Sequence, residues 1–352
     1  MKIIYAFPLL MLFLAVHSAL AVTLPGIPEF IDEMVAKHKF KRAELEKVFD
    51  VAQEVPAVID AISKPPASKP WPEYRANFVN PQRIKLGLEF WHKYRDTLRR
   101  AELKYGVPQD IIVAVIGVET IYGQDAGNFR TLDALTTLAF GYPQRADFFR
   151  SELENFLLLA REQQFDLLSI RGSYAGALGI PQFMPSSYRV YAVDFNGNRR
   201  INLLSEERDA IGSVANFLKV FGWISETAGA LHSAGAGNPL HKGHVKEMPP
   251  IAVRAQVSEQ VCAGDITTQR TIAAWSAAGI VPNLNLSANL AARLVDFTVG
   301  DGKEFWLVFN NFEVITRYNN SDYYAMTVFQ LAEALKEARK AQPRKAMRRA
   351  PL

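Results

Sequence analysis

The sequence contains only one cysteine, Cys262, so it cannot form an internal disulfide. No histidine-bearing motif accompanies this cysteine, and we interpret it as a small buried residue rather than a nucleophile. His241 and His244 lack the further ligands that a zinc site needs. The sequence therefore does not favour cysteine-dependent catalysis, and we expect no cofactor.

Long apolar runs are missing beyond the first residues. Lys2 is followed by the apolar run 3–16 and by Ala19-Leu20-Ala21, which has small residues at the positions that a signal peptidase reads. This pattern predicts a secretory signal peptide over residues 1–21 that directs export and is cut after Ala21. The alternative is a membrane anchor, but the run is short and no charged stop-transfer cluster follows it. We expect no membrane span in the mature chain.

A basic groove is also missing. The formal net charge is +4, yet it would be −1 without Lys2 and the four basic residues among the last twelve, which are Arg344, Lys345, Arg348 and Arg349. The positive charge therefore belongs to a tail, and the sequence does not favour nucleic-acid binding. We predict that residues 342–352 form this disordered basic tail.

Hydrophobic periodicity predicts a mainly α protein of the α+β class. Helical patterns fill residues 22–224, including one long helix through Trp91 and Tyr94. Residues 225–250 change to Ala, Gly, His and Pro and are predicted to be a linker. A small α/β module follows over 251–312, with strands expected at 251–257, 292–299 and 305–318 and a helix at 266–278 capped by Asp265. The chain then returns to the first domain over 313–341.

Glu119 is the residue whose setting indicates chemistry. It ends an apolar helix predicted over 107–120 and lies on the same helical stripe as Ile112 and Ile116. A carboxylate in apolar surroundings has its charged form disfavoured, which raises its pKa towards the range of a general acid. A bland alternative is a helix-end glutamate that pairs with an arginine or faces water. The adjacent Tyr122-Gly123 lets backbone approach a ligand closely, which favours the functional interpretation.

Cleavage of a glycosidic bond normally takes two carboxylates. The candidates for a second carboxylate are Asp125, Asp133, Asp147 and Glu152. None of them lies in an apolar stretch comparable to that of Glu119. We interpret Asp133 and Glu152 as solvated or capping residues. The sequence thus offers one strong carboxylate.

Residues 171–191 combine glycines with amide, hydroxyl and aromatic side chains. No strand precedes Gly172, Gly176 and Gly179, so a dinucleotide-binding loop is rejected, and Ser173 lacks the context of a nucleophile. Amides and hydroxyls bind sugar hydroxyls and acetamido groups, and aromatic rings stack on sugar faces. The segment indicates a sugar-binding loop, although a tightly packed structural loop would explain part of it.

The chain resembles the lytic murein transglycosylase B family. The resemblance is carried in order by GVETIYG, TLDALTTLAF, YPQRADFF, GSYAGALGIPQFMPSSY, YAVDFNG and DAIGSVANF, and later by ITRYNNSDYYAM. It implies a lysozyme-like helical core in residues 22–224. It also implies cleavage of peptidoglycan between N-acetylmuramic acid and N-acetylglucosamine with 1,6-anhydro ends, and a periplasmic location. Peptidoglycan strands would be the partner, with cell-wall synthesis proteins as further candidates, and we expect a monomer.

The resemblance also implies roles for individual residues. Glu119 would be the only general acid and base, oriented by Ser173. Arg145 would meet the acidic lactyl-peptide side of the substrate. The remaining substrate-binding residues would be Gln182, which contacts an acetamido group, with Phe183, Tyr318, Asn319 and Tyr324.

Three departures from the family pattern stand out. Gln144-Arg145 replaces an arginine pair, and Phe217 replaces a frequent tyrosine. Asp194, Asn196 and Asn198 match the first ligands of a calcium loop. Arg199 stands where glycine is usual and Ser205 where an acid is usual, so calcium binding is predicted to be weak or lost.

Two other functions stay open at this point. One is a hydrolytic muramidase, in which Asp125 or another acid activates water. The other is a non-catalytic protein that binds peptidoglycan.

Overall fold

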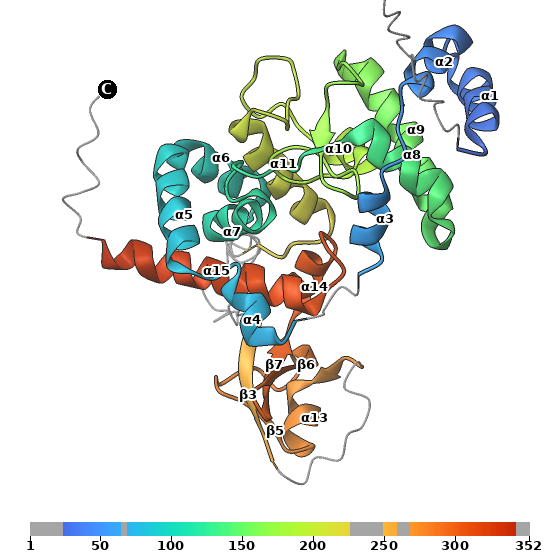
Figure 1. Cartoon of the computed structure of the whole chain (residues 1–352). Helices are drawn as coiled ribbons and strands as arrows, with labels where there is room; N and C mark the ends of the chain where they lie inside the picture. The colour runs from blue at the N-terminus through green and yellow to red at the C-terminus, as the bar shows by residue number, and fades with distance from the viewer. Residues whose placement is uncertain (1–23, 65–68, 226–248, 259–267, 343–352) are drawn as a thin grey trace, which may run out of the picture.

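A helical body with a small sheet module hanging from it makes up the protein (Figure 1). The computed structural model describes residues 24–64, 69–225, 249–258 and 268–342. The predicted signal peptide, most of the predicted linker, Cys262, Asp265 and nearly all of the predicted tail lie outside these residues. The mainly α fold with a small α/β module is confirmed. Within the described residues, no helix combines the length and apolar character needed to cross a membrane.

The first half of the chain is built almost entirely from helices. In chain order they are α1 (Ile27–His38), α2 (Arg42–Asp50), α3 (Pro56–Ile62), α4 (Trp71–Ala76), α5 (Pro81–Lys93), α6 (Arg95–Tyr105), α7 (Gln109–Thr120), α8 (Thr131–Gly141), the 3₁₀ helix η1 (Pro143–Arg145), α9 (Ala146–Gln163), α10 (Pro185–Tyr191) and α11 (Glu207–Val220). Two short strands, β1 (Phe129–Arg130) and β2 (Arg171–Gly172), pair between them.

The second half contains the sheet module and two more helices of the body. Its elements are β3 (Ala252–Val257), β4 (Arg270–Thr271), α13 (Ile272–Ala277), β5 (Ile280–Pro282), β6 (Ala291–Val299), β7 (Gly302–Val308), α14 (Asn310–Thr316) and α15 (Asp322–Ala341).

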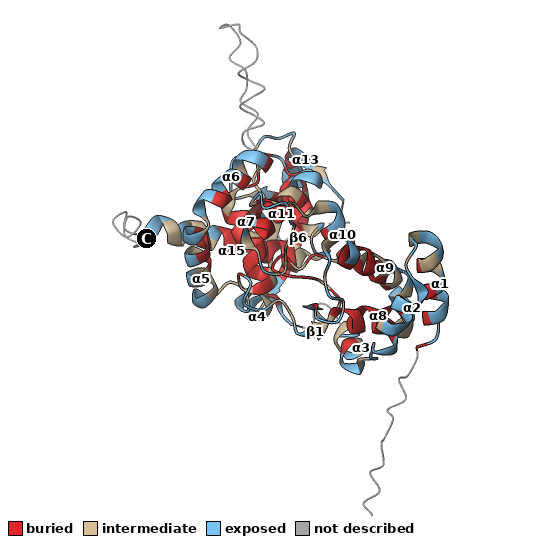
Figure 2. Cartoon of the chain, turned by 90° about the horizontal axis from the view of Figure 1, so that it is seen from above, coloured by how far each residue is buried: buried red, intermediate tan, exposed pale blue. Residues whose placement is uncertain are grey.

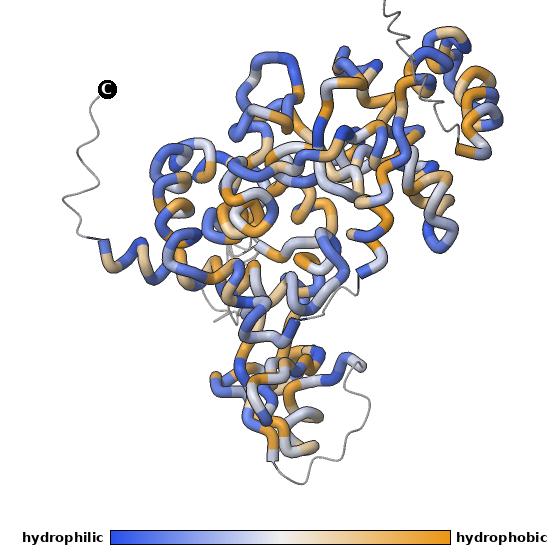
Figure 3. The backbone as a smooth tube through the Cα atoms, viewed as in Figure 1, coloured by the Kyte–Doolittle hydropathy of each residue, from blue (hydrophilic) through white to orange (hydrophobic). Residues whose placement is uncertain are grey.

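Helix α7 runs through the middle of the body. Helices α5, α6, α11 and α15 pack around it, and Figure 2 shows its ribbon as almost wholly buried. Every residue from Asp110 to Val118 is buried, as is Thr120, which explains why this helix is apolar on all sides. Figure 3 shows the same hydrophobic centre surrounded by more hydrophilic outer helices. Glu119 is the one residue between Asp110 and Thr120 that is not fully buried.

The prediction of a single long helix through Trp91 and Tyr94 was wrong. The structure divides it into α5 and α6 at Tyr94, which adopts φ −109° and ψ 21°. The periodicity misled because the apolar stripe continues across the break: Phe90 and Trp91 before it and Leu98 after it are all buried.

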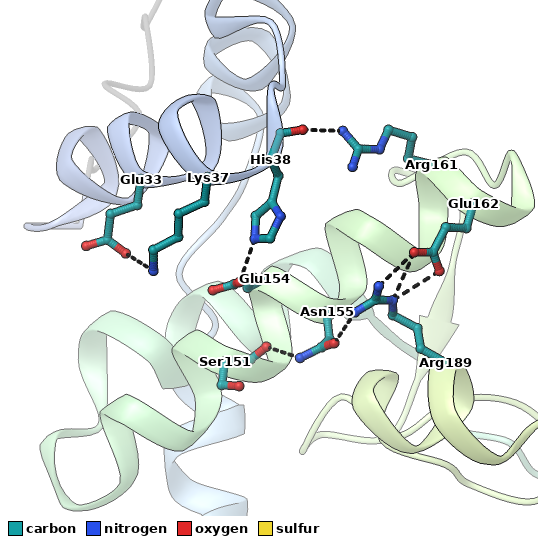
Figure 4. Close-up of polar contacts among 9 residues, drawn as sticks. All are labelled: Glu33, Lys37, His38, Ser151, Glu154, Asn155, Arg161, Glu162 and Arg189. Carbon is teal, nitrogen blue, oxygen red and sulfur yellow. Dashed lines mark hydrogen bonds and ion pairs between the residues drawn. The ribbon is translucent and has the colours of Figure 1, made fainter.

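Helix α9 connects the N-terminal helices to α10 through polar contacts (Figure 4). His38 at the end of α1 lies 2.6 Å from a carboxylate oxygen of Glu154, and Arg161 donates to the carbonyl of His38. On the other side, Arg189 of α10 binds Glu162 and Asn155 of α9. These contacts fix α9 between two parts of the body.

The module is an antiparallel sheet in the order β4-β6-β7-β3-β5 with α13 packed on it. Side chains along its strands point alternately to the module's own core and to the core of the helical body, because successive side chains of a strand lie on opposite faces. Ala292 and Leu294 of β6 join the module's own core, whereas Val295 and Phe297 join the core of the helical body. The sheet is therefore attached to the body by one of its faces.

The chain leaves the body and rejoins it at neighbouring points. The side chains of Asn310 and Asn311 donate to the carbonyls of Gly222 and Ile224, and Ile224 donates back to Asn311. The predicted strand 305–318 was wrong in its second half, because β7 ends at Val308 and helix α14 begins at Asn310. An apolar run of this kind does not separate a strand from a buried helix by periodicity.

Candidate active site

Glu119 lies in the last turn of α7 and keeps partial access to solvent. Its carboxylate accepts a hydrogen bond of 2.5 Å from the hydroxyl of Tyr324, a buried residue in the first turn of α15. The two residues are 205 positions apart in the sequence. The contact therefore exists only because α15 packs along α7.

Burial raises the pKa of Glu119 from its ordinary value of 4.5 to about 7, and the hydrogen bond from Tyr324 opposes this rise. The pKa values of Tyr324 and Tyr318 are raised well above 10, mainly by burial and also by the negative charge of Glu119. Both hydroxyls therefore stay neutral donors. Glu119 can exchange a proton near neutral pH.

A strained turn follows Glu119. Ile121, Tyr122 and Gly123 adopt positive φ angles of 52°, 62° and 89° in succession. This conformation is unfavourable for a β-branched residue such as Ile121 and persists only where the surrounding structure imposes it. The turn ends α7 immediately after its carboxylate.

Thr120 fixes this turn to the sugar-binding loop predicted at 171–191. Its buried hydroxyl donates to the carbonyl of Ile180 at 2.7 Å and accepts from the N–H of Gly123 at 2.9 Å. Strands β1 and β2 bring the same two segments together, with Phe129 opposite Gly172. The structure therefore places the loop beside the carboxylate.

The predicted residues of the loop differ in what they present. The amide nitrogen of Gln182 donates to the carbonyls of Ala126 and Gly179. Its amide oxygen takes no part in these two hydrogen bonds. Its φ of 52° also marks a left-handed position. Phe183 is buried, and its ring contacts those of Phe217 and Tyr318, with centroids 5.6 and 5.7 Å away. Gln182 lies at the surface of the loop and Phe183 supports it from below.

Ser173 has different partners from those that the resemblance implied. Its hydroxyl oxygen accepts from the N–H groups of Ala175 and Ala177, at 3.3 and 3.0 Å. Among the described residues, the hydroxyl that bonds Glu119 is that of Tyr324. An orienting role of Ser173 stays a prediction.

The segment after α14 returns to the loop. The hydroxyl of Tyr318 donates to the carbonyl of Pro181 at 2.6 Å, and the ring of Tyr318 stacks on that of Tyr324 with centroids 6.3 Å apart. Asn319 is exposed beside them. Tyr74 of α4 completes this group, since burial and the charge of Glu119 raise its pKa. Tyr74 was not predicted from the sequence, where the aromatic run WPEYRANF was the only signal for it.

A pocket of about 370 Å³ opens next to these residues. Its polar lining consists of Gln182, Ser186, Ser187 and Arg317, and its apolar lining is Phe183, Met184, Val190, Tyr191, Phe217, Phe221 and Tyr318. Arg317 is the only charged side chain among these and is exposed. Phe217 packs inside the aromatic group, and Tyr191 supplies a phenol close to it. The lining suits a sugar ring with an anionic substituent.

Arg145 takes a different position from the residues above. It is exposed on η1, and its guanidinium lies over the rings of Phe148 and Phe149, 4.4 and 5.1 Å from their centroids. None of its contacts among the described residues is with the group around Glu119. Its contact with the lactyl-peptide side stays a prediction.

Two of the four alternative carboxylates have structural roles. Asp133 binds Arg130 and accepts from the N–H of Gln53. Glu152 accepts hydrogen bonds from the N–H and the hydroxyl of Ser186, and the carboxylate of Glu152 thereby caps the start of α10. Both are buried, so the interpretation of solvated residues was wrong and the capping alternative holds for Glu152. Asp125 and Asp147 are exposed.

The predicted calcium loop is satisfied by its own groups. The carboxylate of Asp194 accepts from the N–H groups of residues 197, 198 and 199, and the side-chain amides of Asn196 and Asn198 donate to Glu206. Glu206 is an acid one position after Ser205, which the sequence analysis missed. Weak or lost calcium binding by this loop stays a prediction.

Comparison with known proteins agrees with this geometry. The model of the transglycosylase SLT domain family matches residues 25–333. The chain belongs to this family. It is 41% identical, over 90% of its length and 84% of the other protein, to the membrane-bound lytic murein transglycosylase B of Escherichia coli (strain K12).

Two solved structures are also similar. The lytic transglycosylase SLT35 of Escherichia coli in complex with calcium has a TM-score of 0.78 and 41% identity, covering 90% of this chain and 94% of that one. SltB3 of Pseudomonas aeruginosa in complex with NAG-NAM-pentapeptide has a TM-score of 0.72 and 27% identity, covering 88% and 78%. The family and the lysozyme-like fold that the sequence indicated are confirmed.

Proposed function

We propose that this transglycosylase cleaves the bond between N-acetylmuramic acid and N-acetylglucosamine in murein and leaves 1,6-anhydro ends, with Glu119 as the single acid and base. The proposal depends on one observation above all. Glu119 has a pKa raised to about 7 and meets a neutral tyrosine hydroxyl beside a pocket lined by aromatic rings and an amide. A group with this pKa can give up a proton and take it back at neutral pH.

Each step follows from that one carboxyl group. Protonated Glu119 gives its proton to the glycosidic oxygen as the bond from C1 of the muramoyl residue to that oxygen breaks. The substrate's own acetamido oxygen stabilises the positive charge that develops at C1. Glu119, now a carboxylate that accepts from Tyr324, takes the proton of the C6 hydroxyl while that oxygen bonds C1. The 1,6-anhydro ring closes, Glu119 is protonated again, and no water is consumed.

The loop and the returning segment would hold the sugar chain. Gln182 has an amide oxygen for an acetamido N–H, since its amide nitrogen is already used by two carbonyls. Phe183 and Tyr318 form the aromatic wall, and Asn319 lies exposed at its edge. Arg317 offers a planar fork to the lactyl or peptide carboxylates of a muramoyl unit. A relative that binds NAG-NAM-pentapeptide supports a substrate of this class.

The hydrolytic alternative needs a second acid to activate water. Two of the four candidates are bound into the structure as described above, and Asp125 is exposed. Asp147 is exposed as well but lies further from Glu119 in the sequence, so Asp125 is the candidate that we use to separate the two mechanisms. We also propose that the protein acts in the periplasm, because its substrate lies there. The expectation of a monomer stays a prediction.

Mass spectrometry of digested sacculi tests the chemistry. We expect anhydro-muramoyl ends from the native protein, a loss of at least about 100-fold in activity for Glu119→Gln, and near-native activity for Asp125→Asn. Reducing muramic acid ends together with an inactive Asp125→Asn would establish the hydrolase instead. Binding of sacculi by the native protein without release of fragments would establish a binding protein.

A further inference from the structure

Arg293 joins the sheet module to both ends of the active-site segment by ion pairs. Arg293 of β6 binds Asp322 with both ends of its guanidinium, at 2.7 and 3.0 Å, and its Nε donates to Glu313 at 2.8 Å. Its side chain is 20% exposed, against 39% for each of the two acids. A planar fork shared between two carboxylates holds its partners in a defined direction as well as at a distance.

The two acids flank the segment that carries the active-site tyrosines. Glu313 is in α14, which ends just before Tyr318, and Asp322 begins α15 two residues before Tyr324. Tyr318 donates to the sugar-binding loop and Tyr324 donates to Glu119. Arg293 therefore holds both ends of the turn from which the two hydroxyls extend.

The position of Arg293 itself is fixed by packing. Side chains at 293, 295 and 297 share the face of β6 that meets the helical body. On this face Phe297 packs on Trp71 of α4 and on Tyr323 of α15, with ring centroids 4.5 and 5.6 Å apart. Strand β6 thus cannot shift along α15 without breaking these aromatic contacts.

We propose that Arg293 is a positioning residue through which the sheet module sets the Tyr324 hydroxyl against Glu119; this inference rests on the function proposed above. The module then has a role in the reaction without touching the substrate. Arg293 does so by restricting where α15 begins, because the hydrogen bond to Glu119 starts only two residues further on.

The pH dependence of kcat/KM distinguishes positioning from simple support. Glu119 must be protonated for the first step, so activity falls as pH rises through its pKa. Loss of the hydrogen bond from Tyr324 removes a contact that favours the carboxylate, which raises this pKa and moves the alkaline limb of the profile upward. A stability change alone does not move this limb.

The experiment compares Arg293→Gln with two reference variants, Tyr324→Phe and Arg254→Gln. Tyr324→Phe gives the full shift of the limb, which we expect to be about 0.5–1 pH unit. Arg293→Gln should shift the limb in the same direction by a smaller amount. Arg254→Gln is the matched control, because Arg254 binds Glu304 within the same sheet. None of its contacts among the described residues is with α14 or α15. Arg254→Gln should leave the profile unchanged.

A double variant completes the cycle. In the Tyr324→Phe background, Arg293→Gln should cause no further shift, because Arg293 acts through that hydroxyl. Equal shifts in both backgrounds, or a profile of Arg293→Gln that coincides with the native one, would overturn the proposal. Arg293→Lys, which keeps the charge and loses the fork, serves if the glutamine variant is too unstable.

Failure of the proposed function gives a different result. An active Glu119→Gln would refute the catalytic role, and the titration of Glu119 followed by NMR of labelled glutamate would still report whether Arg293→Gln raises its pKa. An inactive Glu119→Gln with a shifted Tyr324→Phe and an unshifted Arg293→Gln would refute the positioning role alone.

Discussion

Replacing Glu119 by glutamine should stabilise the protein at pH 8 while it removes activity. In the unfolded chain the carboxyl group titrates near 4.5, whereas burial in the folded protein raises its pKa to about 7. The folded state therefore binds more protons between these values, and the free energy of unfolding falls as pH rises through this window. The loss amounts to about 3 kcal/mol above pH 7. Glutamine is neutral at every pH and can still accept from Tyr324.

Thermal unfolding measured from pH 4 to pH 8 checks this value. We expect the native protein and Glu119→Gln to melt at similar temperatures near pH 4. The variant should melt higher at pH 8, by about 2–4 °C for each kcal/mol. Asp125→Asn, which alters an exposed carboxylate, should follow the native curve.

Two results would refute the reasoning. A difference between the two proteins that does not change with pH would mean that ionisation of Glu119 carries no penalty in the folded state. Lower stability of Glu119→Gln at pH 8 would mean that the carboxylate is stabilised by its surroundings, and the high pKa on which the mechanism depends would then be lost.

Three further predictions concern the surroundings of this carboxyl group. Thr120→Val leaves the carbonyl of Ile180 without its donor in a buried site, and should lower the free energy of unfolding by about 1–3 kcal/mol in urea titrations and reduce activity. Arg317→Gln should lower kcat/KM on peptide-bearing strands about 10-fold and on peptide-free strands less, with the exposed Arg208→Gln unchanged; an equal loss on both substrates would contradict a carboxylate contact. Millimolar calcium should change the melting temperature by less than about 1 °C relative to chelator, and a larger rise would show that the loop at Asp194 binds the ion.

The part of the site that lies on one helix could be predicted from the sequence. The apolar run before Glu119 identifies both α7 and the unusual setting of its carboxylate, since a fully buried helix is apolar all round. The hydrogen bond from Tyr324 could not be predicted in this way, because it joins residues 205 positions apart. The resemblance placed Tyr324 in the site, and packing supplied its partner.

Errors in the predicted elements have a common physical cause. The break at Tyr94 and the change from β7 to α14 at Asn310 both have buried apolar side chains on either side. Hydrophobic pattern reports which side chains are buried, and it does not report where the backbone turns between two buried elements. Glu206 was missed for a related reason. Counting ligand positions along the sequence does not show which carboxylate lies against Asn196 and Asn198 in the folded loop.

The paired asparagines at the junction of module and body have a consequence for how this enzyme can vary. Since Gly222 and Asn310 are hydrogen-bonded to each other, the chain between them leaves and rejoins the body at one place. A change in the length of this segment therefore need not move the helices on either side of it. Homologues could have a longer, shorter or different segment here while the chain around Glu119 keeps its fold. The contacts of β6 with the body would have to be replaced, which are those of Arg293 with α14 and α15 and those of Phe297 with Trp71 and Tyr323.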